Sequence, residues 1–399
     1  MWHIACMFRK KRIYLDYAAS TPVDSRVLRE MRSTLKHYAN PSSIHLEGVK
    51  AQKVLSQART RIARLAQVKS QEIIFTGSGT ESNNLVLQGV VRGYQGSETP
   101  HIVTSSVEHP AILEVCRSLE KRGEAEVTYV HVDEEGLVSV EDVKKSLKEN
   151  TVLVSIMQVN NEIGTIQPIS QISKTVKSFR EERNAQYPYM HTDASQAPCY
   201  LDFHAGRLGV DMITIDSLKV YGPKGVGLLV KKENVTLSPL MYGGGQEKGL
   251  RSGTENVAGI VGLTKALEIA AQEREVEVVK QTEFRDFLIS EIQKIYPKAT
   301  LNGSKEKRVA NNVNMCFANI DTEFLVITLD QKGIATSFSS SCRSRAENAT
   351  SYVVEALGRK ECAESSLRIT FGRYTDKKEL RYFLKILEES LAFVVSSDS

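Results

Sequence analysis

Short apolar segments alternate with amphipathic ones between about residue 72 and residue 232. The apolar segments are rich in β-branched residues and predict strands, and the amphipathic segments predict helices. Strands are expected at 72–75, 101–106, 126–133, 151–159, 189–194, 211–217 and 225–232, and helices at 80–94, 110–123, 139–149 and 169–184. This alternation indicates an α/β fold with a large, doubly wound, mainly parallel sheet.

The pattern changes after Gly259. Residues 260–296 form one long, charge-rich helical run without a strand, and short strands and helices follow it to the end of the chain. We therefore expect a second, smaller α+β domain joined to the first by helix. The predicted division is a large domain at 17–268 and a small domain made of 1–16 with 269–399.

Composition narrows the function classes. The chain has 399 residues, 41% of them hydrophobic, and a formal net charge of +4, which is too small to argue for a nucleic-acid partner. No apolar run is long enough to span a membrane, and the N-terminus lacks the features of a secretion signal. These observations predict a cytoplasmic protein.

The cysteines and histidines show no ligand spacing. The six cysteines are dispersed without a CxxC pair, so neither a disulfide framework nor a zinc cluster is indicated, and most are expected to be reduced core residues. The eight histidines contain no HExxH motif, so a metal site has no support in the sequence.

Polar residues follow the predicted strands. The segment "TGSGTESNN" follows the first strand, and His109, Asn161, Asp193 and Lys219 follow later ones. In an open parallel sheet, ligands bind at the carboxyl ends of the strands. An acid, an imidazole, an amide and a lysine at one sheet edge therefore predict a functional site.

The motifs that carry these residues resemble those of a known family. They include "IYLDYAASTPVD", "NPSSIHLEG", "GSGTESNN", "VNNEIGTIQPI", "HTDASQ", "YGPKGVG", "GGGQEKGLRSGTEN", "SSSCRS" and "LRITFGRYT", in fixed order and nearly end to end. The chain is similar to the cysteine desulfurases, which are class V aminotransferase relatives that depend on pyridoxal 5'-phosphate. The resemblance implies fold type I of the pyridoxal-phosphate-dependent transferases.

The resemblance also implies roles for the residues at the sheet edge. Lys219 is expected to be the Schiff-base lysine and proton-transfer base, Asp193 the partner of the pyridinium nitrogen, and His109 the group stacked on the ring. The implied contacts are Asn161 and Gln196 at the phenolic oxygen, Gly79 and Thr80 at the phosphate, Arg368 at the substrate carboxylate, and Thr254 at the phosphate of a second subunit, which implies a homodimer.

Cys342 is the implied nucleophile. It lies in the polar, serine-rich segment "SFSSSCRSRAENATS", unlike Cys316 and Cys199 in their apolar segments. The family reaction converts L-cysteine to L-alanine and leaves a persulfide on this cysteine, which passes the sulfur to acceptor or scaffold proteins in iron-sulfur cluster assembly or tRNA thiolation. Arg343 and Arg345 would stabilise the thiolate or contact an acceptor protein.

The chain departs from its family before the lysine. The usual serine three residues upstream is Asp216, and the usual histidine immediately before the lysine is Leu218. A carboxylate that faces a phosphate dianion is repulsive. Three arrangements would resolve the conflict: Ser217 supplies the hydroxyl, Asp216 is turned away or protonated, or the pocket holds the cofactor poorly. Ser339 also replaces a usual glycine.

Two other functions stay open from the sequence. A non-catalytic homologue would keep the dimeric fold as a scaffold or regulator and would bind no cofactor. A selenocysteine lyase would keep its activity without Cys342.

Overall fold

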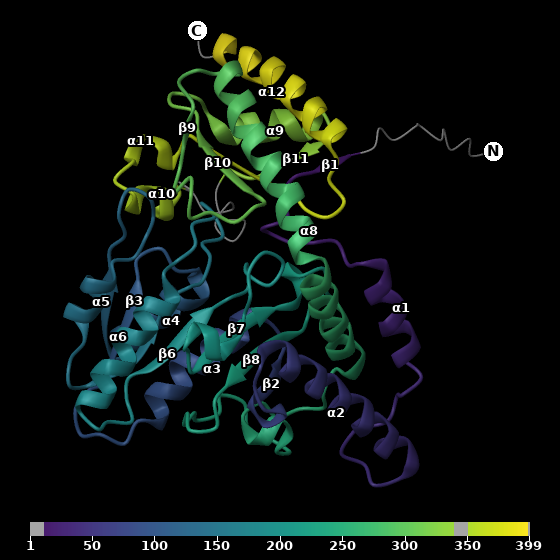
Figure 1. The fold of residues 1–399 in the computed structure, drawn as a ribbon, viewed down its shortest axis with the longest axis vertical. Helices are drawn as coiled ribbons and strands as arrows, with labels where there is room; N and C mark the ends of the chain where they lie inside the picture. Colours follow the sequence, from purple (N-terminus) through teal and green to yellow (C-terminus); the bar gives the residue numbers. More distant parts are fainter. Residues whose placement is uncertain (1–11, 339–349, 398–399) are drawn as a thin grey trace.

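The computed structural model describes residues 12–338 and 350–397. A seven-stranded sheet forms the core of the larger half (Figure 1), and strand β8 runs in the direction opposite to the other six strands. The strand order is β2 (Ile73–Thr76), β8 (Gly227–Lys231), β7 (Met212–Asp216), β6 (Tyr189–Asp193), β5 (Thr151–Ser155), β3 (His101–Ser105) and β4 (Glu126–Val130). The predicted mainly parallel sheet is confirmed.

Helices cover both faces of this sheet. On one face, α3 (Gly79–Gly93) and α4 (Pro110–Lys121) bury apolar side chains against alternate strand residues. The other face is packed by α2 (Leu46–Ala66), α6 (Ile169–Glu182) and the first part of α8. Shorter elements complete this half: α1 (Ser25–Thr34), α5 (Val140–Ser146), α7 (Ala205–Leu208) and the 3-10 turns η1 (Ser70–Glu72), η2 (Ser217–Lys219) and η3 (Gln246–Gly249).

Helix α8 (Val257–Ile295) joins the two halves as a single 39-residue helix. In Figure 1 it runs from the flank of the large sheet up into the smaller half. Its first half packs Ile260 and Leu267 into the large core, and its second half packs Leu288 and Ile292 into the small one. The predicted helical bridge is confirmed, while the proposed boundary between residues 268 and 269 stays a prediction.

The smaller half contains a three-stranded antiparallel sheet in the order β12–β10–β9. Apolar side chains of α8, α9 and α12 cover it. Its elements are β9 (Thr300–Leu301), β10 (Asn312–Cys316), β12 (Ser366–Thr370), α9 (Thr322–Gln331), α10 (Tyr352–Ala356), α11 (Lys360–Ala363) and α12 (Lys377–Ser397).

The start of the described chain connects the two halves. Strand β1 (Ile13–Tyr14) pairs with β11 (Ile334–Ala335) of the smaller half. The chain then reaches the larger half, where the N–H and the hydroxyl of Thr21 both donate to the carbonyl oxygen of Leu218. Residues 16–21 therefore lie between the two halves, beside the ends of β7 and β12.

The cysteine prediction needs a correction. Cys316 at the end of β10 and Cys362 in α11 form a disulfide, while Cys116 and Cys199 are free and buried. The two bonded residues are 46 positions apart, so no local spacing in the sequence could have indicated the bond. Among the described helices, none is long and apolar enough to cross a membrane.

Candidate active site

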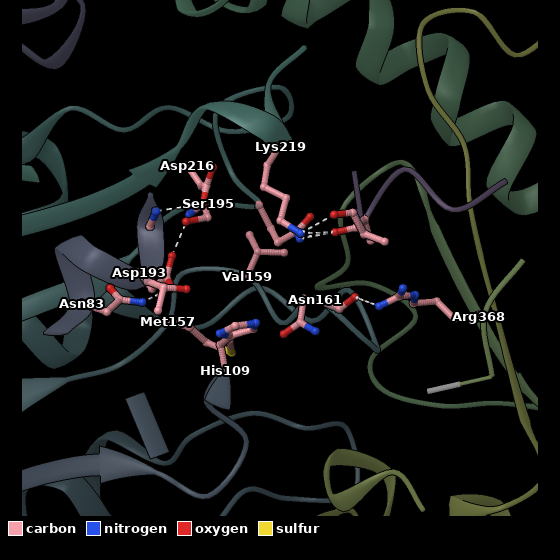
Figure 2. Close-up of a pocket in the computed structure, with 15 residues that line it drawn as sticks. Asn83, His109, Met157, Val159, Asn161, Asp193, Ser195, Asp216, Lys219 and Arg368 are labelled. Atoms are coloured by element: carbon pink, nitrogen blue, oxygen red, sulfur yellow. Dashed lines mark hydrogen bonds between the residues drawn. The ribbon is translucent and has the colours of Figure 1, made fainter. Parts of the chain in front are cut away.

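A pocket lies at the carboxyl ends of the strands, where the larger half meets β12 of the smaller half (Figure 2). The strand-following segments contribute His109, Asn161, Asp193 and Lys219, and Arg368 comes from β12. The other lining residues are Ala18, Ala19, Gly79, Thr80, Asn83, Met157, Val159, Ser195, Gln196 and Asp216. The predicted convergence of polar residues at one sheet edge is therefore present.

Asp193 at the end of β6 is held by two donors. The amide nitrogen of Asn83 donates to Oδ2 at 2.7 Å, and the backbone N–H of Ser195 donates to Oδ1 at 2.9 Å. Asn83 lies on α3, four residues after Gly79, so the helix turns its side chain toward the strand end. These bonds fix the orientation of the carboxylate within the pocket.

Lys219 reaches across the pocket toward the N-terminal segment. Its Nζ donates to the carbonyl oxygens of Ala18 and Ala19, each at 2.7 Å. The amide nitrogen of Gln196 donates to the Ala18 oxygen as well, at 2.9 Å. These two contacts direct the amine toward the N-terminal segment that borders the pocket.

His109 caps the N-terminus of α4. Its Nδ1 accepts the backbone N–H of Ala111 at 3.1 Å, and burial lowers the pKa of the ring, an effect that Lys219 adds to and Asp193 opposes. A ring nitrogen that accepts a hydrogen bond carries no proton, so the neutral ring has its proton on Nε2. His109 thus presents a neutral N–H donor.

Glu108, the residue before His109, is a buried carboxyl behind the pocket. Its Oε1 accepts the hydroxyl of Ser105 at 2.6 Å and the N–H of Met157 at 2.9 Å. Burial raises the pKa of Glu108 to about 8, although both of these donors lower it. The carboxyl is therefore mostly protonated at pH 7.

Arg368 is 2% exposed. Its Nη1 donates to the carbonyl oxygen of Asn161 at 3.0 Å, and its Nη2 pairs with Asp16 at 2.8 Å. Within the described part of the chain, Nε of Arg368 and Oδ1 of Asn161 have no hydrogen-bond partner. Buried polar atoms without partners are costly, so this side of the pocket is suited to a polar ligand.

Asp216 points at the N-terminus of α3. Its Oδ2 accepts the N–H of Gly79 at 2.8 Å, and its Oδ1 accepts the N–H of Leu218 at 3.1 Å. Burial raises the pKa of this carboxyl, an effect that the two N–H donors and Lys219 oppose. Of the three arrangements left open by the sequence, the one in which Asp216 is turned away does not occur, because the side chain lines the pocket.

The hydroxyl of Ser217 lies outside the pocket that Asp216 lines. Ser217 is fully buried and does not line the pocket, and its Oγ lies 2.2 Å from where a Cβ on Gly222 would stand. Its predicted contact with a cofactor phosphate is therefore not made in this geometry. The hydroxyl faces the turn after the lysine, so the shift of one residue from position 216 turns it away from the sheet edge.

The remaining predicted residues divide into three groups. Gly79 and Thr80 line the pocket at the start of α3, as predicted. Thr254 is exposed and outside the pocket of its own chain, so its predicted role across a subunit boundary stays a prediction. Cys342, Arg343, Arg345 and Ser339 lie outside the described residues.

Sequence reasoning missed the residues that hold the others in place. Asn83 and Ser195 orient Asp193, and Ala18 and Ala19 hold Lys219. All four belong to motifs already noted as similar to a family, "LDYAAS", "GTESNN" and "DASQ". Only the motifs could have indicated these residues, because Ala18 and Ala19 act through backbone carbonyl oxygens and not through their side chains.

The comparisons with known proteins agree with this geometry. The family model described as aminotransferase class-V matches residues 13–383. A cysteine desulfurase IscS from Dictyoglomus turgidum is 44% identical over 381 residues, covering 95% of this chain and 94% of the relative. The cysteine desulfurase IscS 1 of Archaeoglobus fulgidus is 41% identical over 376 residues, covering 94% of this chain and 95% of that protein.

Among solved structures, one titled as a NifS-like protein superposes with a TM-score of 0.88 at 36% identity, covering 96% of this chain and all of its own. With 96% of this chain covered, the match spans both halves of the molecule. On the family model and these relatives, the chain belongs to the aminotransferase class-V family.

Proposed function

We propose that this protein is a cysteine desulfurase that uses pyridoxal 5'-phosphate. The observation that carries the proposal is the convergence of Lys219, Asp193, His109 and Arg368 on one pocket. The relatives named cysteine desulfurase support it, as does a solved structure titled "SspA in complex with cysteine", which matches with a TM-score of 0.77 at 35% identity over 91% of this chain and all of its own.

The residues at one end of the pocket fit the ring of the cofactor. We call Asn83, His109, Asp193 and Lys219 the ring end. It offers an amine, a carboxylate with a fixed orientation and a neutral N–H donor, and the unpartnered Oδ1 of Asn161 lies close by. When bound, the pyridoxal ring draws electrons from the substrate α-carbon. Asp193 would hold a proton on the ring nitrogen and so keep that withdrawal strong.

The part of the pocket at the N-terminus of α3, next to the ring end, fits a phosphate only in part. We call Gly79, Thr80 and Asp216 the phosphate end. The N-terminus of α3 favours an anion, and a Cβ at Gly79 would stand 3.0 Å from the Cβ of Asp216, so glycine leaves needed room there. The Asp216 carboxylate already uses the Gly79 N–H, however.

The chain's own groups would then act in order on the substrate. Arg368 would bind the carboxylate of L-cysteine, with Nε as an unused donor. Lys219 Nζ would take the α-proton and return a proton to release alanine. The thiolate of Cys342 would attack the substrate sulfur, so that cysteine and the protein thiol become alanine and a protein persulfide. An acceptor protein would then take this sulfur.

The proposal includes a homodimer. Large apolar side chains are exposed around the α1–α2 connection and before Thr254, with Tyr38 83% and Ile44 97% exposed. The others are Leu35, Leu46, Met241 and Tyr242. Exposed large apolar side chains in such number are a feature of subunit interfaces. Sedimentation at the mass of a single chain would contradict this part of the proposal.

The test of function follows both products. The protein is incubated with pyridoxal 5'-phosphate, L-cysteine and a reductant, and alanine and sulfide are measured. We expect equal amounts of both, and a loss of at least about 100-fold in Cys342→Ala. The matched control is Cys199→Ala, which removes a buried free thiol outside the pocket. Undiminished turnover in Cys342→Ala would indicate a lyase, and no products from the unaltered chain would indicate a scaffold.

A further inference from the structure

The phosphate end contains an anion of its own. Asp216 is 8% exposed and accepts N–H groups from Gly79 and Leu218 with its two oxygens. The first of these donors belongs to α3, a 15-residue helix whose N-terminus faces the pocket. A carboxylate therefore takes up part of the positive potential that a bound phosphate would use.

The other charged groups nearby do not offset this carboxylate fully. Asp193 of β6 adds negative charge, and Lys219 of η2 supplies a positive one but points to the carbonyls of Ala18 and Ala19. At the start of α3, Glu81 is paired with Arg251 at 2.9 Å and also accepts the N–H of Gly77. His109, across the pocket, is held neutral by burial, which lowers its pKa.

On the basis of the proposed function, we propose that Asp216 makes phosphate binding in this pocket depend on the uptake of one proton. A phosphate group at neutral pH carries nearly two negative charges, and its approach to a buried carboxylate is repulsive. A proton on Asp216 removes the repulsion and turns one carboxyl oxygen into a donor toward the phosphate. Asp216 is thus a specificity-determining residue for the phosphate end.

A consequence is that the pocket distinguishes poorly between a phosphorylated ligand and its alcohol at alkaline pH. Pyridoxal lacks the phosphate and presents a hydroxymethyl group, which can donate a hydrogen bond to an ionised carboxylate. Both ligands carry the same aldehyde for Lys219. Free pyridoxal is largely closed to a hemiacetal by its hydroxymethyl group, but this equilibrium in solution is the same for every variant. The difference in the ratio of dissociation constants between the unaltered chain and its variants therefore isolates the phosphate end.

The experiment measures binding rather than activity. Equilibrium dialysis of the full-length chain freed of cofactor gives the Kd of pyridoxal and of pyridoxal 5'-phosphate from pH 6.5 to 8.5. In the unaltered chain, the preference for the phosphate form is expected to fall by up to about tenfold per pH unit, the limit for one proton. In Asp216→Asn it is expected to be nearly constant and, at pH 8.5, at least about tenfold higher.

The choice of the two variants keeps the result interpretable. Asp216→Asn retains the size and an acceptor oxygen for Gly79, and thermal unfolding checks its fold. Glu108→Gln is the matched control, because Glu108 is a buried carboxyl with a pKa of about 8 that does not line the pocket. Its variant is expected to keep the pH dependence of the unaltered chain.

The outcomes separate this inference from the proposed function. A pH-independent preference in the unaltered chain would overturn the inference, as would a pH dependence lost in Glu108→Gln but kept in Asp216→Asn. If neither ligand binds to any variant, the proposed function fails and the inference fails with it. Binding of pyridoxal 5'-phosphate only after the Asp216 substitution would support the inference and overturn the function.

Discussion

The carboxylates at the ring end and at the phosphate end of the pocket accept hydrogen bonds from different kinds of donor. Asp193 at the ring end is held by a side-chain amide and one backbone N–H, and neither comes from the first turn of a helix. Asp216 at the phosphate end takes the N–H of Gly79, the first residue of α3. Under the proposed function, Asp193 would face a cationic ring nitrogen, whereas Asp216 would compete with the anion expected beside it. The same residue type supports binding at one end and opposes it at the other.

The largest expected effect tests the ring end. Lys219→Ala removes the amine, and we expect loss of the visible absorption of lysine-bound cofactor and a fall in kcat of at least about 1000-fold. The control is Lys224→Ala, an exposed lysine of the same "YGPKG" segment. An unchanged spectrum in Lys219→Ala would contradict this view of the ring end, because the amine of Lys219 would then not bind the cofactor.

The role predicted for Lys219 came from the resemblance of its motif to a family, whereas its place at the sheet edge follows from the order of segments along the chain. The parallel sheet, the long helix and the meeting of His109, Asp193 and Lys219 at one edge all follow from alternating apolar and amphipathic segments. The direction in which each side chain points could not be predicted from these patterns. Ser217 and Asp216 are adjacent, and only the three-dimensional path of the η2 turn determines which of them faces α3.

The disulfide and the contacts that support Lys219 also could not be predicted from the sequence. Cys316 and Cys362 meet because β10 and α11 pack together, and this long-range contact has no local pattern. Likewise, Ala18 supports Lys219 through a backbone oxygen, which every residue has. Features carried by backbone position or by distant packing are thus the ones that residue type cannot indicate.

A smaller effect is expected from the residue that orients Asp193. Asn83→Ala removes a 2.7 Å hydrogen bond, and we expect kcat to fall about tenfold with KM for cysteine nearly unchanged. The pH profile of the cofactor absorbance should also shift, because Asp193 would hold the ring proton less firmly. Reduced stability with an unchanged profile would limit Asn83 to a structural role.

The smallest effect on the reaction is expected at Glu108, where stability is the sensitive measurement. Its folded-state pKa of about 8 lies above the usual value of 4.5, so the folded chain binds more protons between these pH values and stability falls as the pH rises through them. Between pH 6.5 and 8.5, urea unfolding should show a smaller loss in Glu108→Gln than in the unaltered chain. An equal loss would place the titration on another group.

Helix α8 couples the two halves of the molecule that together form the pocket. At 1.5 Å per residue its 39 residues form a rod roughly 58 Å long, and the side chains of Leu267 and Leu288 anchor it in different cores. Lys219 lies in the larger half and Arg368 in the smaller half, so the distance between these two side chains depends on both cores. A substitution that shifts α8 in either core would therefore change the geometry of the pocket even where the substituted residue lies far from it.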